Sequence, residues 1–86
     1  MVLVACSVFD VKASAYMQPF FVPNTSMAIR SFGDAVVNPE TGISKHPEDF
    51  QLFKVGEFDD NSGLFSPVPV PEYLSKAVDF LNKKEG

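Results

Sequence analysis

The chain has to fold around a hydrophobic core alone, because its single cysteine, Cys6, excludes a disulfide or a multi-thiolate metal site within it. At 86 residues that core is thin, since a domain of this size buries only about 60–65% of its unfolded surface. Nine Phe and two Tyr residues enlarge the area that the core can bury. We expect a single domain over residues 1–86 and a homo-oligomer, because a subunit interface buries further apolar surface.

The first half of the chain predicts two strands and a helix. Residues 2–9 are apolar and rich in β-branched side chains, which indicates a strand near the sheet centre and is too short for a membrane span or signal core. Residues 19–22 begin with a proline and predict a short edge strand. Asn24 can cap a helix that Asn38-Pro39 ends. The apolar face of this helix carries Ala28, Ile29, Phe32, Ala35 and Val36, and Gly33 suggests close packing against a neighbour.

The second half predicts a loop, a hairpin and a second helix. Residues 40–49 are polar and indicate a loop with a turn at 46–49. Residues 50–58 predict a strand with Phe53 and Val55 on one face and Leu52 and Phe58 on the other, followed by a turn at 59–63. An edge strand at 64–68 is expected to end at the prolines, and Pro71 to begin a helix that continues to about Asn82. The predicted fold is α+β: a small, mainly antiparallel sheet of three to four strands with two helices packed on one face.

Composition and motifs argue against an enzyme and against a cofactor. Gly-rich phosphate loops, serine elbows and paired cysteines are absent from the sequence, and Cys6 lies in an apolar strand where burial keeps a thiol inert. The net charge of −4 and the pI near 4.7 work against tight non-specific binding to phosphate backbones. Any nucleic-acid role therefore needs a local concentration of cations.

Two polar clusters have a functional and a structural interpretation. His46, Glu48 and Asp49 could bind a metal or transfer a proton, but His-Pro followed by two carboxylates is also typical of a polar turn, which we favour. Asp59 and Asp60 lie in a segment that resembles a calcium loop but lacks the further acidic ligand of an EF-hand. We therefore expect no metal and a solvated hairpin tip.

Aromatic rings beside cations could form a stacking platform for single-stranded nucleic acid. The alternative is that most of these rings belong to the core. Phe21, Phe53 and Phe58 are further rings that could join such a platform. The candidate nucleic-acid-binding residues are Lys12, Tyr16, Phe20, Arg30, Lys45 and Lys54.

A family resemblance rests on three stretches: Phe9-Asp10-Val11-Lys12-Ala13, Gln18-Pro19-Phe20-Phe21, and His46-Pro47-Glu48-Asp49-Phe50 leading into residues 52–60. Residues 1–66 resemble the small nonstructural protein of gokushoviruses, tailless icosahedral single-stranded DNA phages of the Microviridae. The resemblance implies a non-virion protein of the host bacterial cytoplasm that takes part in viral DNA synthesis, and it supplies no catalytic residue. The matching positions are Asp10, Lys12, Pro19, His46, Pro47, Asp49, Gly56 and Glu57, and the roles of Asp10, His46, Asp49 and Glu57 stay open.

Two functions are compatible with these features. The first is an accessory protein of viral DNA replication or packaging that binds single-stranded DNA as an oligomer. The second is an interaction module whose acidic surface around Glu57, Asp59 and Asp60 engages the viral initiator, the procapsid or a host replication protein. Neither requires a membrane.

Overall fold

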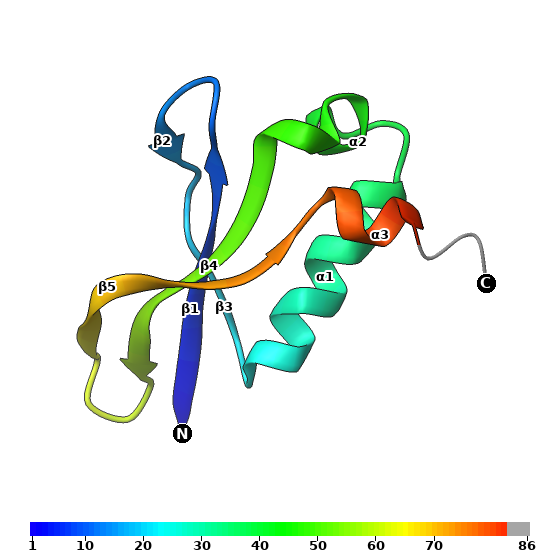
Figure 1. Ribbon diagram of the computed structural model, residues 1–86. Coiled ribbons are helices and arrows are strands. Elements are labelled where there is room, and N and C mark those ends of the chain that lie inside the picture. The colour runs from blue at the N-terminus through cyan, green and yellow to red at the C-terminus, as the bar shows by residue number, and fades with distance from the viewer. Residues whose placement is uncertain (83–86) are drawn as a thin grey trace.

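The computed structural model describes residues 1–82 and contains one curled antiparallel sheet with helices on one side of it (Figure 1). In chain order the elements are β1 (Val2–Asp10), β2 (Ala15–Tyr16), β3 (Phe20–Val22), α1 (Thr25–Val37), α2 (Gly42–Lys45), the 3-10 turn η1 (Pro47–Asp49), β4 (Phe50–Asp59), β5 (Leu64–Lys76) and α3 (Val78–Asn82). The strand order is β2-β1-β4-β5, and β3 pairs with β1 as well. The predicted α+β fold is confirmed, with β1 at the sheet centre.

Helix α1 forms where the sequence predicts it and supplies one wall of the core. The side chain of Asn24 accepts a hydrogen bond from the backbone N–H of Met27 at 3.0 Å, which satisfies one of the free amides of the first turn. The apolar face of the helix then packs on the sheet. The buried core consists of Cys6, Val8, Ala28, Phe32, Val36, Ile43, Leu52 and Ala77.

A bulge at Val55 interrupts the pairing of β4 with β1. Ala5 is paired with Gly56, and the next residue, Cys6, is paired with Lys54, so Val55 is left without a partner on β1. One extra residue in a strand moves every following side chain to the other face of the sheet.

Because of this bulge, the predicted distribution of β4 side chains between the two faces of the sheet is wrong for Phe58. Phe58 lies on the same face as Phe53, not with Leu52 as predicted, because its partner Leu3 is on the helix-free side of β1. Lys54 and Glu57 confirm the shift. They are three residues apart, which would separate them in a regular strand, yet their charged groups are 3.1 Å apart.

Strand β5 is longer than predicted, and the second helix is correspondingly shorter. The prediction of a helix from Pro71 is wrong: β5 continues to Lys76, and α3 starts only at Val78. Between the pairs Gly56–Pro67 and Lys54–Glu72, residues 68–71 of β5 face only residue 55 of β4. Because the strand bows away from its partner there, the prolines within it need not donate to the ladder.

The segment between α1 and β4 is more regular than the loop predicted for residues 40–49. It contains the short helix α2, whose first turn is capped by the side chain of Thr41, and then η1. Ile43 of α2 reaches the core, which explains why this polar stretch folds back on the sheet. Within residues 1–82, no helix has the length and apolar character that crossing a bilayer requires.

Candidate nucleic-acid interface

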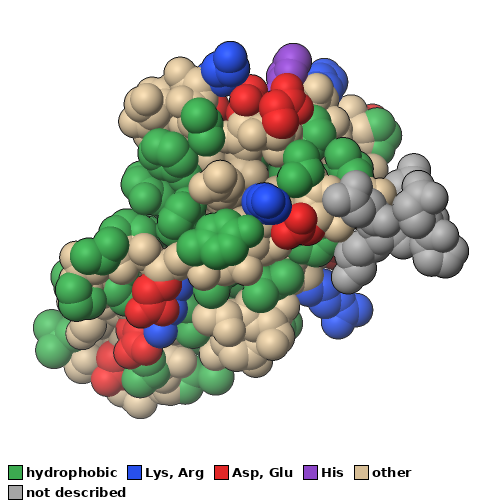
Figure 2. Space-filling model, viewed as in Figure 1, with side chains coloured by type: hydrophobic (Ala, Val, Ile, Leu, Met, Phe, Trp, Pro, Cys, Tyr) green, Lys and Arg blue, Asp and Glu red, His purple; other side chains and the backbone are tan. Residues whose placement is uncertain are grey.

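Most aromatic rings of this protein lie on the face of the sheet that the helices leave open. The strand pairing places seven rings there, whereas Phe20, Phe32, Phe50 and Phe80 belong to the core side. Hydrophobic side chains accordingly line the left-hand side of the molecule in Figure 2. The seven rings form a four-ring cluster of Phe9, Tyr16, Phe53 and Tyr73 and a three-ring cluster of Phe21, Phe58 and Phe65.

The four-ring cluster extends across β2, β1, β4 and β5. Its centre is Phe53, whose ring centroid lies 5.7 Å from Tyr16, 5.9 Å from Tyr73 and 6.4 Å from Phe9, in each case edge to face. Phe9 and Tyr16 are 4.8 Å apart. Phe9 and Phe53 are half-buried, while Tyr16 and Tyr73 remain 45% and 53% exposed. The two phenylalanines thus support two tyrosines that have ring surface available to a ligand.

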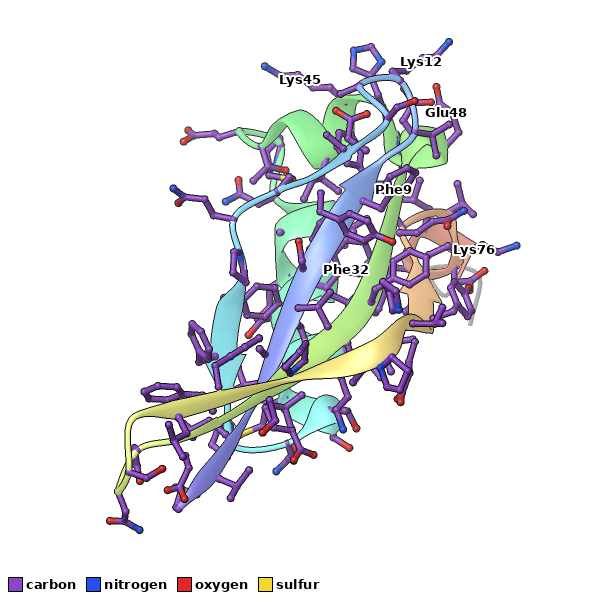
Figure 3. All side chains as sticks on the ribbon, turned by 90° about the vertical axis from the view of Figure 1, so that its left-hand side faces the viewer. Phe9, Lys12, Phe32, Lys45, Glu48 and Lys76 are labelled. Atoms are coloured by element: carbon purple, nitrogen blue, oxygen red, sulfur yellow. The ribbon has the colours of Figure 1, made fainter. Side chains whose placement is uncertain are left out.

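The strands contribute one lysine and no carboxylate to the face of the four-ring cluster. Lys76 is paired with Gln51, which in turn is paired with Phe9, so these three residues share one row on the helix-free face. Figure 3 looks onto that face, with Lys76 to the right of Phe9 and Lys12 above it. The acidic residues of the described strands occupy the alternate positions, whose side chains point to the other side; they are Asp10, Glu57, Asp59 and Glu72.

Sequence reasoning missed three members of this surface. Tyr73 and Lys76 were assigned to the second helix, and Phe9 was taken as part of a buried strand. The sequence feature that could have revealed the longer strand is the run of prolines at positions 67, 69 and 71. Three prolines at alternate positions fit an extended edge strand better than the start of a helix, since only the first helical turn tolerates proline.

The other predicted nucleic-acid-binding residues do not join the rings. Phe20 packs against the core. Lys54 points to the opposite face and pairs with Glu57. Arg30 lies on the outer side of α1, across the sheet from the four-ring cluster, and Lys45 lies at the end of α2, at the same end of the molecule as Lys12 (Figure 3). Of the six predicted residues, Tyr16 belongs to the four-ring cluster, and Lys12 lies in the turn between β1 and β2.

Three of the motif positions with open roles, Asp10, His46 and Asp49, line one open cleft of about 480 Å³ together with Lys12, Glu48 and Phe50. The possible ligand atoms of His46, Glu48 and Asp49 lie within 4.8 Å of one another, the one such group in the described part of the chain. Asp10 also organises the turn after β1, because its carboxylate accepts from the backbone N–H groups of Lys12 and Ala13. The cleft is shallow and solvated, and the ammonium of Lys12 is an available counter-charge for its carboxylates.

Cys6 lies at the centre of the core between β1 and the helices. Burial raises the pKa of its thiol, and the positive charge of Lys54 offsets this only in part. The thiol is therefore protonated at neutral pH and lacks the access that a nucleophile needs.

The predicted acidic surface lies at the far end of the sheet, on the β4–β5 hairpin (Figure 2). Two of its carboxylates have internal partners: Glu57 pairs with Lys54 at 3.1 Å, and Asp60 pairs with the N-terminal amine at 2.6 Å. A hydrogen bond from the backbone N–H of Asn61 is the main cause that lowers the pKa of Asp59. The hairpin end is thus anionic but partly neutralised within the chain.

Comparison with known proteins places the chain in a phage family. The profile of the Phage ORF5 protein family matches residues 3–80. Protein ORF5 of Chlamydia phage 1 is 35% identical over 66 residues, which cover 72% of this chain and 69% of that protein. No solved structure matches. These matches confirm the resemblance seen in the sequence motifs: the chain belongs to the Phage ORF5 protein family, the small nonstructural proteins of gokushoviruses.

Proposed function

We propose that this protein acts by binding single-stranded DNA across the four-ring cluster, as an accessory of viral DNA replication or packaging and not as an enzyme. The observation that carries the proposal is the pair of half-exposed tyrosines, Tyr16 and Tyr73, on a sheet face whose strands contribute a lysine and no carboxylate. Unstacked bases have two free faces, and exposed aromatic rings on a sheet bind them without sequence-specific hydrogen bonds.

The charge distribution supports DNA in spite of the acidic composition. The chain carries a net charge of −4, but the acidic side chains of the strands point away from the rings. Lys76 lies at the margin of the cluster, where it can contact a phosphate while the bases stack. The local charge of a protein surface, and not the net charge of the protein, decides whether the phosphate backbone of DNA can approach that surface.

A fluorescence-anisotropy titration with a labelled oligonucleotide of about 8 nucleotides tests the proposal, since one small fold engages roughly 4 to 16 nucleotides. Tyr73→Ala removes one stacking ring and should weaken binding about tenfold, because each stacked base contributes roughly 1–3 kcal/mol. Lys76→Ala should flatten the dependence of log K on log salt by about 0.7. Duplex DNA of the same length should bind more weakly, because its bases are already stacked.

Arg30→Ala is the matched control for Lys76→Ala. It removes the same charge from the helix side of the sheet and should leave both the affinity and the salt dependence unchanged. Absence of binding at about 50 µM protein and low salt, where even non-specific complexes form, would rule the proposal out. Equal losses of affinity in the Arg30 and Lys76 variants would show that DNA does not bind at the four-ring cluster.

The acidic interaction module remains an alternative. Its support is the exposed group of carboxylates at the hairpin end, although two of the three are already paired within the chain. Two results together would favour the module. The first is an affinity for the oligonucleotide that Tyr73→Ala leaves unchanged, and the second is a viral or host protein whose binding to this chain depends on Asp59.

A further inference from the structure

Gln51 is an uncharged polar side chain within the aromatic part of the helix-free face. In its row of the sheet it lies between its two paired residues, Phe9 of β1 and Lys76 of β5, which Figure 3 labels. Two residues along β4, on the same face, is Phe53, which is paired with Tyr73. Gln51 is therefore diagonal to Tyr73, a separation that long side chains span across a sheet.

The amide group of Gln51 has no hydrogen-bond partner within residues 1–82, although the residue is half-buried. Every buried side-chain nitrogen or oxygen of the described residues does have a partner, so the amide of Gln51 reaches the solvent. The side chain therefore presents an unused donor and an unused acceptor on the face where the rings of the four-ring cluster are exposed.

A side-chain amide matches the hydrogen-bonding edge of every unpaired base. It has a carbonyl oxygen as acceptor and an NH₂ group as donor, side by side. The Watson–Crick edges of adenine and cytosine carry an amino donor next to a ring-nitrogen acceptor, and those of guanine and thymine carry a ring N–H donor next to a carbonyl acceptor. One amide can therefore form two hydrogen bonds with any of the four bases. It can do so only while the base is unpaired, because pairing occupies the same edge.

We infer that Gln51 is the residue that distinguishes unpaired from paired DNA at the four-ring cluster, without preference for one base. The inference rests on the proposed function and adds a contact with the base edge to the stacking described there. A base that stacks on Tyr73 lies within reach of the Gln51 amide across the diagonal, and Lys76 in the same row can contact the backbone. Stacking alone discriminates less well, because the end of a duplex also offers a free base face to a ring.

An oligothymidine of about 8 nucleotides and its N3-methylated counterpart test this inference. The methyl group removes the N–H donor of the Watson–Crick edge and leaves the ring face and the phosphates in place. In fluorescence-anisotropy titrations, wild-type protein should bind the methylated strand about tenfold more weakly, because the hydrogen bonds to the base edge are lost. Gln51→Met keeps the length of the side chain and removes the amide, so this variant should bind both strands with the same reduced affinity. Strands of adenine or cytosine should bind wild-type protein within about fivefold of oligothymidine.

Asn61→Met is the matched control. Asn61 has an exposed side-chain amide in the turn between β4 and β5, at the other end of β4 from Gln51. Its replacement should leave the affinities for both strands at their wild-type values. Circular dichroism checks the fold of the Gln51 and Asn61 variants.

Three results would overturn the inference and leave the proposed function standing. The first is wild-type protein that binds the two strands equally tightly, since the base edge would then make no contact. The second is a Gln51→Met variant that still distinguishes the two strands, because another group would then contact the edge. The third is a preference for one base beyond the range given above. A protein that binds no oligonucleotide would contradict the proposed function and this inference together.

Discussion

Gly56 lies beneath the ring of Phe65, where its missing side chain lets two strands and a ring approach one another. A Cβ atom built on Gly56 would be 2.5 Å from the Phe65 ring and 2.8 Å from the backbone oxygen of Ser66. A ring can rotate away, but the backbone of a paired strand cannot. Gly56 is also one of the positions that match the gokushovirus motif, and close packing gives that match a structural reason.

Gly56→Ala should lower the free energy of unfolding by about 1–3 kcal/mol, the usual cost of forcing extra volume into a packed site. Urea denaturation followed by circular dichroism measures the change. Gly42→Ala is the control, because nothing lies within 4 Å of a Cβ atom there and alanine favours the helix in which the residue lies. Gly42→Ala should be neutral or slightly stabilising; a similar loss in both variants would show that the contact at Gly56 is not the cause.

Helix α3 packs against α1 through the ring of Phe80. The ring of Phe80 lies over Gly33 and makes an edge-to-face contact with Phe32 at 5.8 Å. The prediction that Gly33 marks close packing is confirmed, with α3 as the neighbour. Because α3 is only one short helix, its position depends on this contact more than on its own helical stability.

Gly33→Ala should destabilise the protein by about 1 kcal/mol or more, even though alanine in a helix interior is favoured over glycine by roughly that amount. The reason is that the new Cβ atom would lie 2.5 Å from the Phe80 ring. Thermal unfolding checks the sign. Replacing Phe80 by leucine in the Gly33→Ala background should recover part of the loss, whereas a stabilised Gly33→Ala single variant would show that α3 can move aside freely.

The helix-free face of the whole molecule is divided between two clusters of different polarity. The four-ring cluster has two phenolic hydroxyls, Gln51 and Lys76, whereas the strand positions around the three-ring cluster are apolar. The proposed function uses the four-ring cluster, because a phosphate backbone needs cations near the rings. Rings of similar exposure in the two clusters should therefore differ in their effect on DNA binding.

Phe65→Ala should leave the affinity for an oligonucleotide of about 8 nucleotides unchanged, whereas Tyr73→Ala should weaken it about tenfold. The two residues are 47% and 53% exposed on the same strand, so a difference between the variants reports the position of the ring and not its exposure. Anisotropy titrations of both variants provide the measurement, and circular dichroism checks their fold. Equal losses of affinity in the two variants would show that DNA does not distinguish the two clusters.

Sequence reasoning identified the fold class, the central strand, the edge strand, α1 with its cap, and the hairpin turn. Each of these follows from short-range rules: a run of β-branched residues, a capping side chain, or a turn rich in Asp, Asn and Gly. The same rules failed over residues 71–76, where the apolar spacing of Leu74 and Ala77 suits a helix as well as a strand that enters the core. Only pairing with β4 decided between them.

The candidate site could be predicted from the sequence less well than the fold, because it depends on contacts between distant parts of the chain. The sequence by itself determined that the chain is rich in rings, acidic and without the marks of catalysis. The tertiary structure decided which rings share the helix-free face, because the bulge at Val55 moves Phe58 to that face. A single unpaired residue in one strand reverses every side chain after it, and no local pattern in the sequence records where that residue lies.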